Sequence, residues 1–470
     1  MFNQITVAEA TAERWDMVIA GSSFAAMFFL RGLPSGLRVL IVEKGEILPH
    51  ADQLAAFSRP RETYAQQNTS GHFKDWVAHT MFGGNSNCWW GQVPRFHPND
   101  FRLAQMYGVG AAWPLGYDDL EPFYAEVEQV MQVAGGDSEH ILPRSAPFPF
   151  PPHALSRSDI ACRAAFPDIW VPVATARSNG GSRATCCANG VCDLCPVDAK
   201  FTVLNGIDGF LRDGVSLLTG AEAWRVDIAA GRATGLVIRA GDATATVAAD
   251  QVALATNAVN NAAILLRSGV DSPALGAYLH EQHSLELEID VAAPGYFGGS
   301  SITGHCYGFY DGPHRSGAAA VLVENYNAPN ALRAERGRWS ERMKLKLIAE
   351  DLPQADNRVS LGADDQPRLT WVGHSDYARA GLKRAEDNLQ DILPFALERI
   401  VARRSPATEA HIQGTHRMGA DPATSVVDNT LRLHRVANLF ALGSGVYPTS
   451  SAANPTLTLS ALSLRAGRLV

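Results

Sequence analysis

The feature that most constrains the fold of this chain is a strand–turn–helix–strand pattern near its N-terminus. Residues 16–20 form an apolar run of strand type, residues 24–30 are expected to form an apolar helix, and residues 39–43 form a second strand-like run. Gly21 stands directly after the first run, and Glu43 follows Gly21 by 22 residues. This order and spacing predict a βαβ unit of the kind that binds a mononucleotide.

Five positions of this predicted unit are candidates for binding a dinucleotide cofactor. Gly21 permits the tight turn after the first strand, Ala26 permits close packing of helix on strand, and Glu43 would bond a ribose hydroxyl. Ser22 and Ser23 complete the turn. Ser23 departs from the usual pattern, because a glycine commonly stands there and lets the backbone approach the pyrophosphate. We expect the turn to bind the cofactor despite this departure.

The last sixty residues contain a candidate proton acceptor and a helix start. Asn454 is expected at the helix cap, with Pro455 and Thr456 opening the helix, whose free N–H groups suit an anionic partner. His411 lies in a Gly/Thr-rich loop that folding can bring beside Asn454. A histidine there would deprotonate a hydroxyl while a hydride leaves the neighbouring carbon. Taken alone, the block also fits a structural histidine and an ordinary helix cap.

Together with three internal segments, these motifs resemble the glucose–methanol–choline family of flavin oxidoreductases from end to end. Residues 82–91 look like the family's Gly-Gly-x-Ser loop that covers the flavin. Residues 113–124 and 353–361 are similar to its Trp-Pro…Tyr…Leu-x-Pro-x-Tyr and Pro-x-x-x-Asn-Arg-Val segments. Gly443 and Ser444 look closer to the pyranose oxidases and bacterial sugar dehydrogenases than to other branches.

The resemblance implies an α/β fold in which a Rossmann-like FAD-binding domain is interrupted by an α+β substrate domain with an antiparallel sheet. The FAD-binding domain would take residues 12–280 and 405–470, with an irregular, cysteine-containing excursion at 101–200. The substrate-binding domain would take residues 281–404. Residues 285–291 alternate between apolar and acidic side chains, which predicts a half-buried antiparallel strand at its start.

The function implied by the resemblance is FAD-dependent oxidation of a hydroxyl carbon of a sugar, polyol or other alcohol. His411 would take the hydroxyl proton while hydride passes to flavin N5, and Asn454 would orient the alkoxide. The further residues expected to contact FAD are Gly84, Asn85, Ser86, Cys88, Gly443, Ser444, Pro455 and Thr456. Two alternatives remain, a non-redox lyase on the same flavin fold and a flavin-fold binding protein without catalysis. The presence of both His411 and Asn454 favours the oxidoreductase.

Other side chains compete for these roles. His280, His283 and His416 are further candidate proton acceptors, and we interpret them as structural. Cys88 stands where pyranose oxidases carry a histidine bonded covalently to the flavin. A thiolate can form such a bond, and a lone cysteine in an apolar setting can equally be buried without a chemical role. Both interpretations of Cys88 remain open.

Four of the seven cysteines lie within ten residues of one another. Such density is typical of a metal centre. Bacterial sugar and gluconate dehydrogenases of the family look similar here and carry a 3Fe-4S cluster that passes electrons to a cytochrome. Cys187, Cys192 and Cys195 would be the ligands, with Cys186 as an alternate. The last two cysteines are one residue further apart in those dehydrogenases than Cys192 and Cys195, and other family members have a similar stretch without a cluster. Cluster and no cluster therefore both remain open. A dehydrogenase is slightly favoured over an oxidase.

Charge and hydropathy limit the partners and the cellular location. The formal net charge of −8 argues against a nucleic-acid partner, which needs clustered Lys and Arg. Residues 17–30 are too short an apolar run to span a membrane. The acidic first sixteen residues are unlike a signal peptide. We therefore expect a cytoplasmic enzyme with a small-molecule substrate. If the cysteines bind a cluster, we expect in addition a cytochrome as electron acceptor and a small subunit whose signal peptide directs export of the complex.

Overall fold

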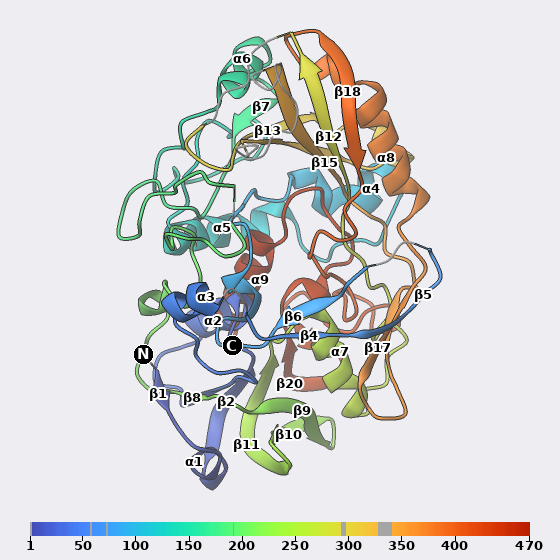
Figure 1. The fold of residues 1–470 in the computed structure, drawn as a ribbon. Coiled ribbons are helices and arrows are strands. Elements are labelled where there is room, and N and C mark those ends of the chain that lie inside the picture. The colour runs from blue at the N-terminus through green and yellow to red at the C-terminus, as the bar shows by residue number, and fades with distance from the viewer. Residues whose placement is uncertain (1, 57–58, 72–73, 191, 293–297, 328–340) are drawn as a thin grey trace.

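The computed structural model describes residues 2–470 except 57–58, 72–73, 191, 293–297 and 328–340. Figure 1 shows one sheet in the lower half of the molecule and another in the upper half, with helices α5 (Tyr117–Met131) and α9 (Thr456–Arg468) between them. Parallel and antiparallel pairs both occur. The fold is α/β with a Rossmann-like part, as the resemblance implied.

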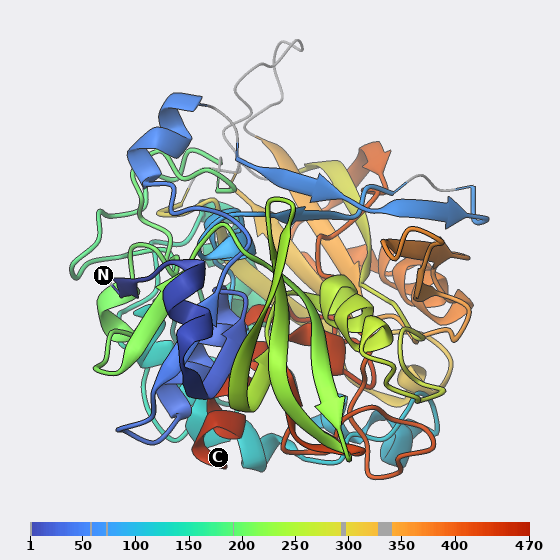
Figure 2. The same ribbon diagram turned by 90° about the horizontal axis from the view of Figure 1, so that it is seen from below.

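The lower sheet, called the nucleotide sheet below, has a parallel centre and an antiparallel edge. Its strand order is β1 (Asn3–Gln4), β8 (Val215–Leu218), β3 (Val39–Val42), β2 (Arg14–Ala20), β11 (Ala243–Leu254), β10 (Arg232–Ala240) and β9 (Glu222–Ala229), with β20 (Val436–Ala441) beside β11 and β19 (Arg432–Leu433) beside β20. Figure 2 shows β9–β11 in green, with helix α7 (Ala258–Arg267) beside them.

The predicted βαβ unit is present as β2, helix α2 (Phe24–Gly32) and β3, with β2 and β3 parallel. Helix α2 packs against α9 at two glycines. A Cβ at Gly32 would lie 2.4 Å from the Leu464 oxygen, and one at Gly467 would lie 2.3 Å from the Phe29 oxygen. The two helices therefore approach backbone to backbone near their C-terminal ends, which fixes α9 against the βαβ unit.

The upper sheet, called the antiparallel sheet below, pairs neighbouring strands in opposite directions. Its order is β18 (Leu397–Arg404), β12 (His283–Val291), β15 (Arg342–Ala349), β14 (Val321–Tyr326), β13 (Ile302–Phe309) and β7 (Trp170–Pro172). Helix α8 (Asp376–Asp387) belongs to the same apolar cluster as alternate residues of β12 and β15. The alternation predicted for residues 285–291 is present, but β12 is not half-buried, because its polar face is covered as well, with Glu286 9% and Asp290 0% exposed.

Two small sheets connect segments that are distant in sequence. One has the order β16 (Arg358–Leu361), β17 (Pro367–Trp371) and β5 (Ala65–Asn68), and the other pairs β4 (Arg61–Thr63) with β6 (Val77–His79). The remaining α-helices of the described residues are α1 (Val7–Ala12), α3 (His50–Ala56), α4 (Leu103–Tyr107) and α6 (Arg157–Ala165). None of the described helices combines the length and apolar character that a membrane crossing requires.

The antiparallel sheet draws most of its strands from the segment expected to form the substrate domain. β12 begins at His283 and β18 ends at Arg404. β7 comes from the cysteine-containing excursion instead and pairs with β13, while β16 and β17 join β5 from the FAD-binding segment. The division into 12–280 with 405–470 and 281–404 therefore stays a prediction about which segments form separate units.

A candidate active site between the two sheets

Two adjoining cavities lie where parallel strands of the nucleotide sheet end. Residues directly after β2, β3, β11 and β20 line them, which is where open α/β sheets bind their ligands. The smaller cavity, about 100 Å³, is called the nucleotide cavity below, and the larger, about 630 Å³, the reaction cavity. Both are lined by Ser23, His79, Asn85, Thr256 and Asn257. Together they form one elongated site with the turn after β2 in the middle.

The turn after β2 opens the first helical N–H groups to this site. Gly21 has a φ of +96°, and a Cβ there would lie 2.6 Å from the Ala255 oxygen, so the turn requires glycine. Ser23 is the N-cap of α2 but makes no side-chain cap hydrogen bond. Ser23, Phe24 and Ala25 line the reaction cavity. An uncapped helix start facing a cavity suits a phosphate group.

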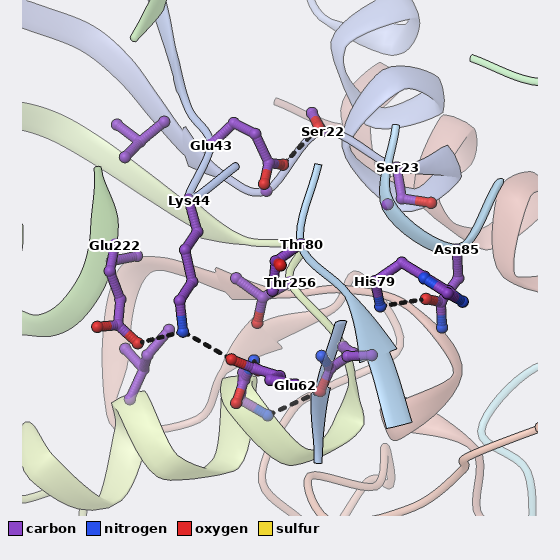
Figure 3. Close-up of a pocket in the computed structure, with 18 of the residues that line it drawn as sticks. Ser22, Ser23, Glu43, Lys44, Glu62, His79, Thr80, Asn85, Glu222 and Thr256 are labelled. Atoms are coloured by element: carbon purple, nitrogen blue, oxygen red, sulfur yellow. Dashed lines mark hydrogen bonds and ion pairs between the residues drawn. The ribbon is translucent and has the colours of Figure 1, made fainter. Parts of the chain in front are cut away.

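Glu43 is buried at the nucleotide cavity and held by two donors. Its Oε2 accepts a hydrogen bond from the Ser22 hydroxyl at 2.5 Å (Figure 3), and its Oε1 accepts one from the Gly45 N–H at 2.9 Å. Ser22 in turn accepts from the Gly83 N–H at 2.8 Å, so it joins β2, β3 and the loop at 82–91. Burial raises the pKa of Glu43 to about 7, although these hydrogen bonds act to lower it.

The structure adds residues to the nucleotide cavity that the sequence did not single out. Lys44 Nζ lies 2.6 Å from Glu62 Oε2 and 3.1 Å from Glu222 Oε1, and all three side chains line the cavity (Figure 3). Only Lys44 adjoins a predicted residue. Ala26 was predicted both to pack helix on strand and to bind the cofactor; it is fully buried and lines neither cavity, so the structure places it in the packing position only. These features fit the adenosine half of a dinucleotide, with a ribose acceptor at Glu43.

The loop at 82–91 forms the other side of both cavities. Its 3₁₀ turn η1 (Gly84–Asn87) places Asn85 at both cavities and Ser86 and Cys88 at the reaction cavity. The loop is fixed by side-chain hydrogen bonds to backbone, from the His79 N–H to Asn85 Oδ1 at 2.9 Å and from the Val203 N–H to Ser86 Oγ at 3.1 Å. Burial raises the pKa of the Cys88 thiol, which favours the neutral form. A covalent bond from Cys88 to the cofactor stays a prediction.

His411 and Asn454 both line the reaction cavity, as do Gly443, Ser444, Pro455 and Thr456. The expectation that Asn454 caps α9 was wrong. The helix starts at Thr456 with Pro455 at the cap position, and no side chain caps it. Asn454 Oδ1 is buried without a hydrogen-bond partner among the described residues. Because Asn454 does not cap the helix, its side-chain amide can bind a ligand in the cavity.

The ring of His411 is oriented by Gln282. An isolated antiparallel bridge pairs His280 with Gln413, and this register puts Gln282 opposite His411. Gln282 Nε2 donates to the backbone oxygens of Ser451 at 2.7 Å and Ala453 at 2.8 Å. Its Oε1 must therefore face His411 Nδ1, with which it is hydrogen-bonded. The acceptor Oε1 places the proton on Nδ1 and leaves Nε2 with a free lone pair.

Electrostatics keep His411 neutral before reaction. Burial lowers its pKa to about 4, although Glu281 and Glu324 act to raise it. His416 and His280 are deeper, and each is hydrogen-bonded to a backbone oxygen, that of Leu442 at 3.3 Å for His416 and that of Tyr278 at 2.7 Å for His280. Neither lines the reaction cavity. Among the described residues, His411 and His79 are the histidines that line this cavity, and His79 lies where it meets the nucleotide cavity.

The clustered cysteines do not converge in the part of the chain that the structure describes. Cys187 is exposed, Cys192 Sγ lies 3.3 Å from Ser301 Oγ, and Cys195 Sγ accepts from the Ala199 N–H at 3.3 Å. Cys186 Sγ lies 3.6 Å from Ser300 Oγ. Among the described residues, no three His, Cys, Asp or Glu side chains form a group that could hold a metal ion. The residues as placed do not fit an iron–sulfur cluster, and we derive no step through one.

The far wall of the reaction cavity is the polar face of the antiparallel sheet. The sequence placed substrate specificity in this sheet but named no residue there. The structure identifies the side chains that line this wall as Glu286, Glu324, Tyr326, Lys344, Lys346 and Arg404. Glu286, Lys344 and Lys346 alternate with apolar residues along β12 and β15. This period-two pattern indicates a polar face of each strand but does not show which side chains of other strands that face will meet.

Comparison with known proteins agrees with this geometry. The chain is 30% identical over 98% of its length to 6'''-hydroxyparomomycin C oxidase of Streptomyces lividus, covering 92% of that protein. It is 28% identical over 82% of its length to the fructose dehydrogenase large subunit of Gluconobacter japonicus, covering 79% of that protein. The fold is similar to that of pyridoxine 4-oxidase from Mesorbium loti, with a TM-score of 0.71, 19% identity and coverage of 97% of this chain and 99% of that one.

Family profiles match two long segments of the chain that contribute to the site. Residues 72–284, which include the loop at 82–91 and Gln282, match one GMC oxidoreductase profile. Residues 348–463, which include His411 and Asn454, match a second. With the nucleotide turn, an uncapped helix start and a proton acceptor assembled around one cavity, the chain belongs to the GMC oxidoreductase family of flavoproteins.

Proposed function

We propose that this enzyme uses FAD to oxidise a hydroxyl carbon of a sugar, polyol or other alcohol, with His411 as the proton acceptor and Asn454 as the donor to the substrate oxygen. The family acts on such hydroxyls. The observation that carries the residue assignment is the hydrogen bond between Gln282 Oε1 and His411 Nδ1, which leaves Nε2 able to accept a proton in the reaction cavity.

The nucleotide half of the site binds and positions the cofactor in this proposal. Glu43 accepts hydrogen bonds from ribose, and the N-terminus of α2 with Ser23 faces the pyrophosphate. Gly84, Asn85, Ser86, Cys88, Gly443, Ser444, Pro455 and Thr456 line the region left for the flavin. When bound, FAD supplies the hydride acceptor that no side chain of the protein can supply.

In the reaction cavity the protein's own groups handle the proton and the substrate oxygen. His411 Nε2 removes the hydroxyl proton, and the Nδ1–H bond to Gln282 stabilises the ring orientation as the imidazolium forms. Asn454 donates to the alkoxide oxygen. The uncapped N-terminus of α9 presents its positive end to the same cavity, which favours negative charge that develops there.

For the electrons, we propose direct transfer to an acceptor that enters the cavity, oxygen or a small molecule, without an iron–sulfur relay. This replaces the slight preference for a cluster-bearing dehydrogenase, because the described thiols have separate partners. Iron and acid-labile sulfide should both be absent from anaerobically purified protein that retains flavin and activity. Three irons per flavin would overturn this part of the proposal.

The test of the function itself is spectroscopic. Purified holoenzyme should show flavin absorbance that bleaches anaerobically on addition of an alcohol from a panel of sugars, polyols and amino sugars. Admission of oxygen or an artificial acceptor should restore the colour. A yellow protein that no alcohol bleaches would favour the lyase or binding alternatives, and a colourless protein that does not take up FAD would contradict the cofactor assignment.

A further inference from the structure

A row of charged side chains crosses the antiparallel sheet on the face toward the reaction cavity. The strand register pairs Arg404 with Glu286, Glu286 with Lys346, Lys346 with Glu324, and Glu324 with His305. The first four of these residues line the cavity. Directly paired residues of neighbouring strands share one face of a sheet, so the row forms a continuous wall of alternating charge.

The arginine and the lysines of this wall are each bound to a carboxylate other than Glu324. Arg404 Nη2 lies 2.8 Å and Lys344 Nζ 3.1 Å from Glu286 Oε2. Lys346 Nζ lies 2.6 Å from Glu409 Oε2, although Lys346 and Glu324 are register partners. Among the described residues, Glu324 is thus the carboxylate of the row that no lysine or arginine binds, and its nearest basic group is His305, 3.5 Å away.

Glu324 is nevertheless almost completely buried, with 2% of its surface exposed. Its Oε1 has no hydrogen-bond partner among the described residues, and His305 Nε2 lies 3.5 Å away. That same nitrogen lies 3.3 Å from Gln92 Oε1. Burial acts to raise the pKa of Glu324, yet the pKa is lowered because His305, Lys346 and His411 favour the charged form. A buried anion whose hydrogen bonding is incomplete is costly in free energy unless a ligand completes it.

We propose that Glu324 binds a protonated amine of the substrate, so that the natural substrate is an amino sugar or amino polyol. A neutral hydroxyl would complete the hydrogen bonding of the carboxylate but would leave its charge unmatched, whereas an ammonium group completes both. The inference rests on the function proposed above, because it places the amine in the cavity where the hydroxyl is oxidised.

Glu324 and His411 line the same reaction cavity. One substrate molecule can therefore present an amine to Glu324 and the reacting hydroxyl to His411. The charge of Glu324 also favours the protonated imidazole of His411. Glu324 has a second possible effect, which is to stabilise protonated His411. That effect would be the same for every substrate, so a comparison of aminated and neutral substrates distinguishes it from amine binding.

The test compares matched substrate pairs that differ by one amine-to-hydroxyl exchange, D-glucosamine with D-glucose and 2-amino-1,3-propanediol with glycerol. Binding to oxidised holoenzyme is measured by calorimetry, and anaerobic flavin reduction is measured separately. The wild type should prefer the aminated member of at least one pair by about 10- to 100-fold, the range of a hydrogen bond between charged groups. Glu324→Gln should abolish that preference and leave the affinity for the neutral member nearly unchanged.

Glu288→Gln is the matched control, because Glu288 is on the same strand and face as Glu286 but does not line the reaction cavity. Glu288→Gln should retain the full preference for the aminated substrate. Glu324→Asp should retain part of that preference, because aspartate keeps the negative charge. No amine preference in either pair, or an equal loss for both members in Glu324→Gln, would overturn the proposal. If the enzyme oxidises alcohols but shows no amine preference, the role of Glu324 is contradicted and the proposed function stands. If the enzyme binds the amines but oxidises no alcohol, the proposed function is contradicted and the role of Glu324 stands.

Discussion

The two ends of the elongated site recognise their ligands in different ways. At the nucleotide cavity, the residues predicted to bind the cofactor, Gly21, Ser23 and Glu43, belong to one βαβ unit, although Glu62 and Glu222 from other segments also line the cavity. At the wall of the reaction cavity, the side chains come from four strands that meet only through sheet register. The predicted cofactor contacts can therefore be located from local sequence, whereas the residues of the wall can be identified only once the sheet is assembled.

The largest effect is expected at the reaction end. His411→Ala should slow flavin reduction by about 10²- to 10⁴-fold while the protein stays yellow, because the proton acceptor is lost and the nucleotide cavity is untouched. Stopped-flow absorbance measures the rate. His140→Ala, which alters an exposed histidine, is the control. Unchanged reduction in His411→Ala would remove His411 from the mechanism.

Glu43→Ala should weaken FAD binding by about 10- to 100-fold and yield mostly apoprotein, because the ribose loses a charged acceptor. The flavin-to-protein absorbance ratio and titration of apoprotein with FAD measure this. Glu46→Ala, at an exposed position three residues further on, should leave the ratio unchanged. Full flavin occupancy in Glu43→Ala would show that the local unit does not bind the cofactor as described.

Gln282→Leu should slow flavin reduction by about tenfold with little change in substrate affinity, because the His411 ring loses its Nδ1–H acceptor. Gln282→Glu keeps an acceptor and adds a negative charge, so it should move the limiting pKa of flavin reduction upward. A pH profile of the reduction rate distinguishes the two variants. Identical profiles in wild type and Gln282→Glu would contradict a positioning role.

FAD affinity should also depend on pH through Glu43. Its pKa in the apoprotein is raised to about 7, so the carboxyl group becomes protonated as pH falls through 7 and loses acceptor capacity for the ribose. Affinity should therefore rise several-fold from pH 6 to pH 8, with a slope of at most about tenfold per unit. In Glu43→Gln the dependence should vanish. A wild-type affinity that falls with rising pH would have the wrong sign for this linkage.

The smallest effect is expected at Ser23. Ser23→Gly should tighten FAD binding slightly or leave it unchanged, because it permits a closer backbone approach to the pyrophosphate at a position without a side-chain cap bond. Titration of the apoprotein measures the change. A loss of affinity of tenfold or more would mean that the Ser23 hydroxyl itself binds the cofactor, and the nucleotide end would then depend on side chains as the reaction end does.

Several site residues could be proposed from sequence because their structural demand is local. Gly21 requires a backbone conformation that favours glycine, and the distance from Gly21 to Glu43 follows from the length of one strand–helix–strand unit. His411 and Asn454 belong to short segments similar to those of the family. The start of α9 was predicted within one residue of its position in the structure. The difference is important because an Asn454 that capped the helix would have its side-chain oxygen bonded to the backbone, whereas in the structure that oxygen has no hydrogen-bond partner among the described residues.

The sequence by itself therefore determined the family and the α/β class, and it proposed the cofactor-binding unit and the candidate base, which stay predictions. Tertiary structure alone decided which groups surround that base. Gln282 reaches His411 through a bridge between segments about 130 residues apart, and Lys346 bonds Glu409 in preference to Glu324. The cysteines, adjacent in sequence, face separate partners. Local patterns fix backbone conformation, but side-chain partners across a sheet depend on register, which is set by the packing of the whole chain.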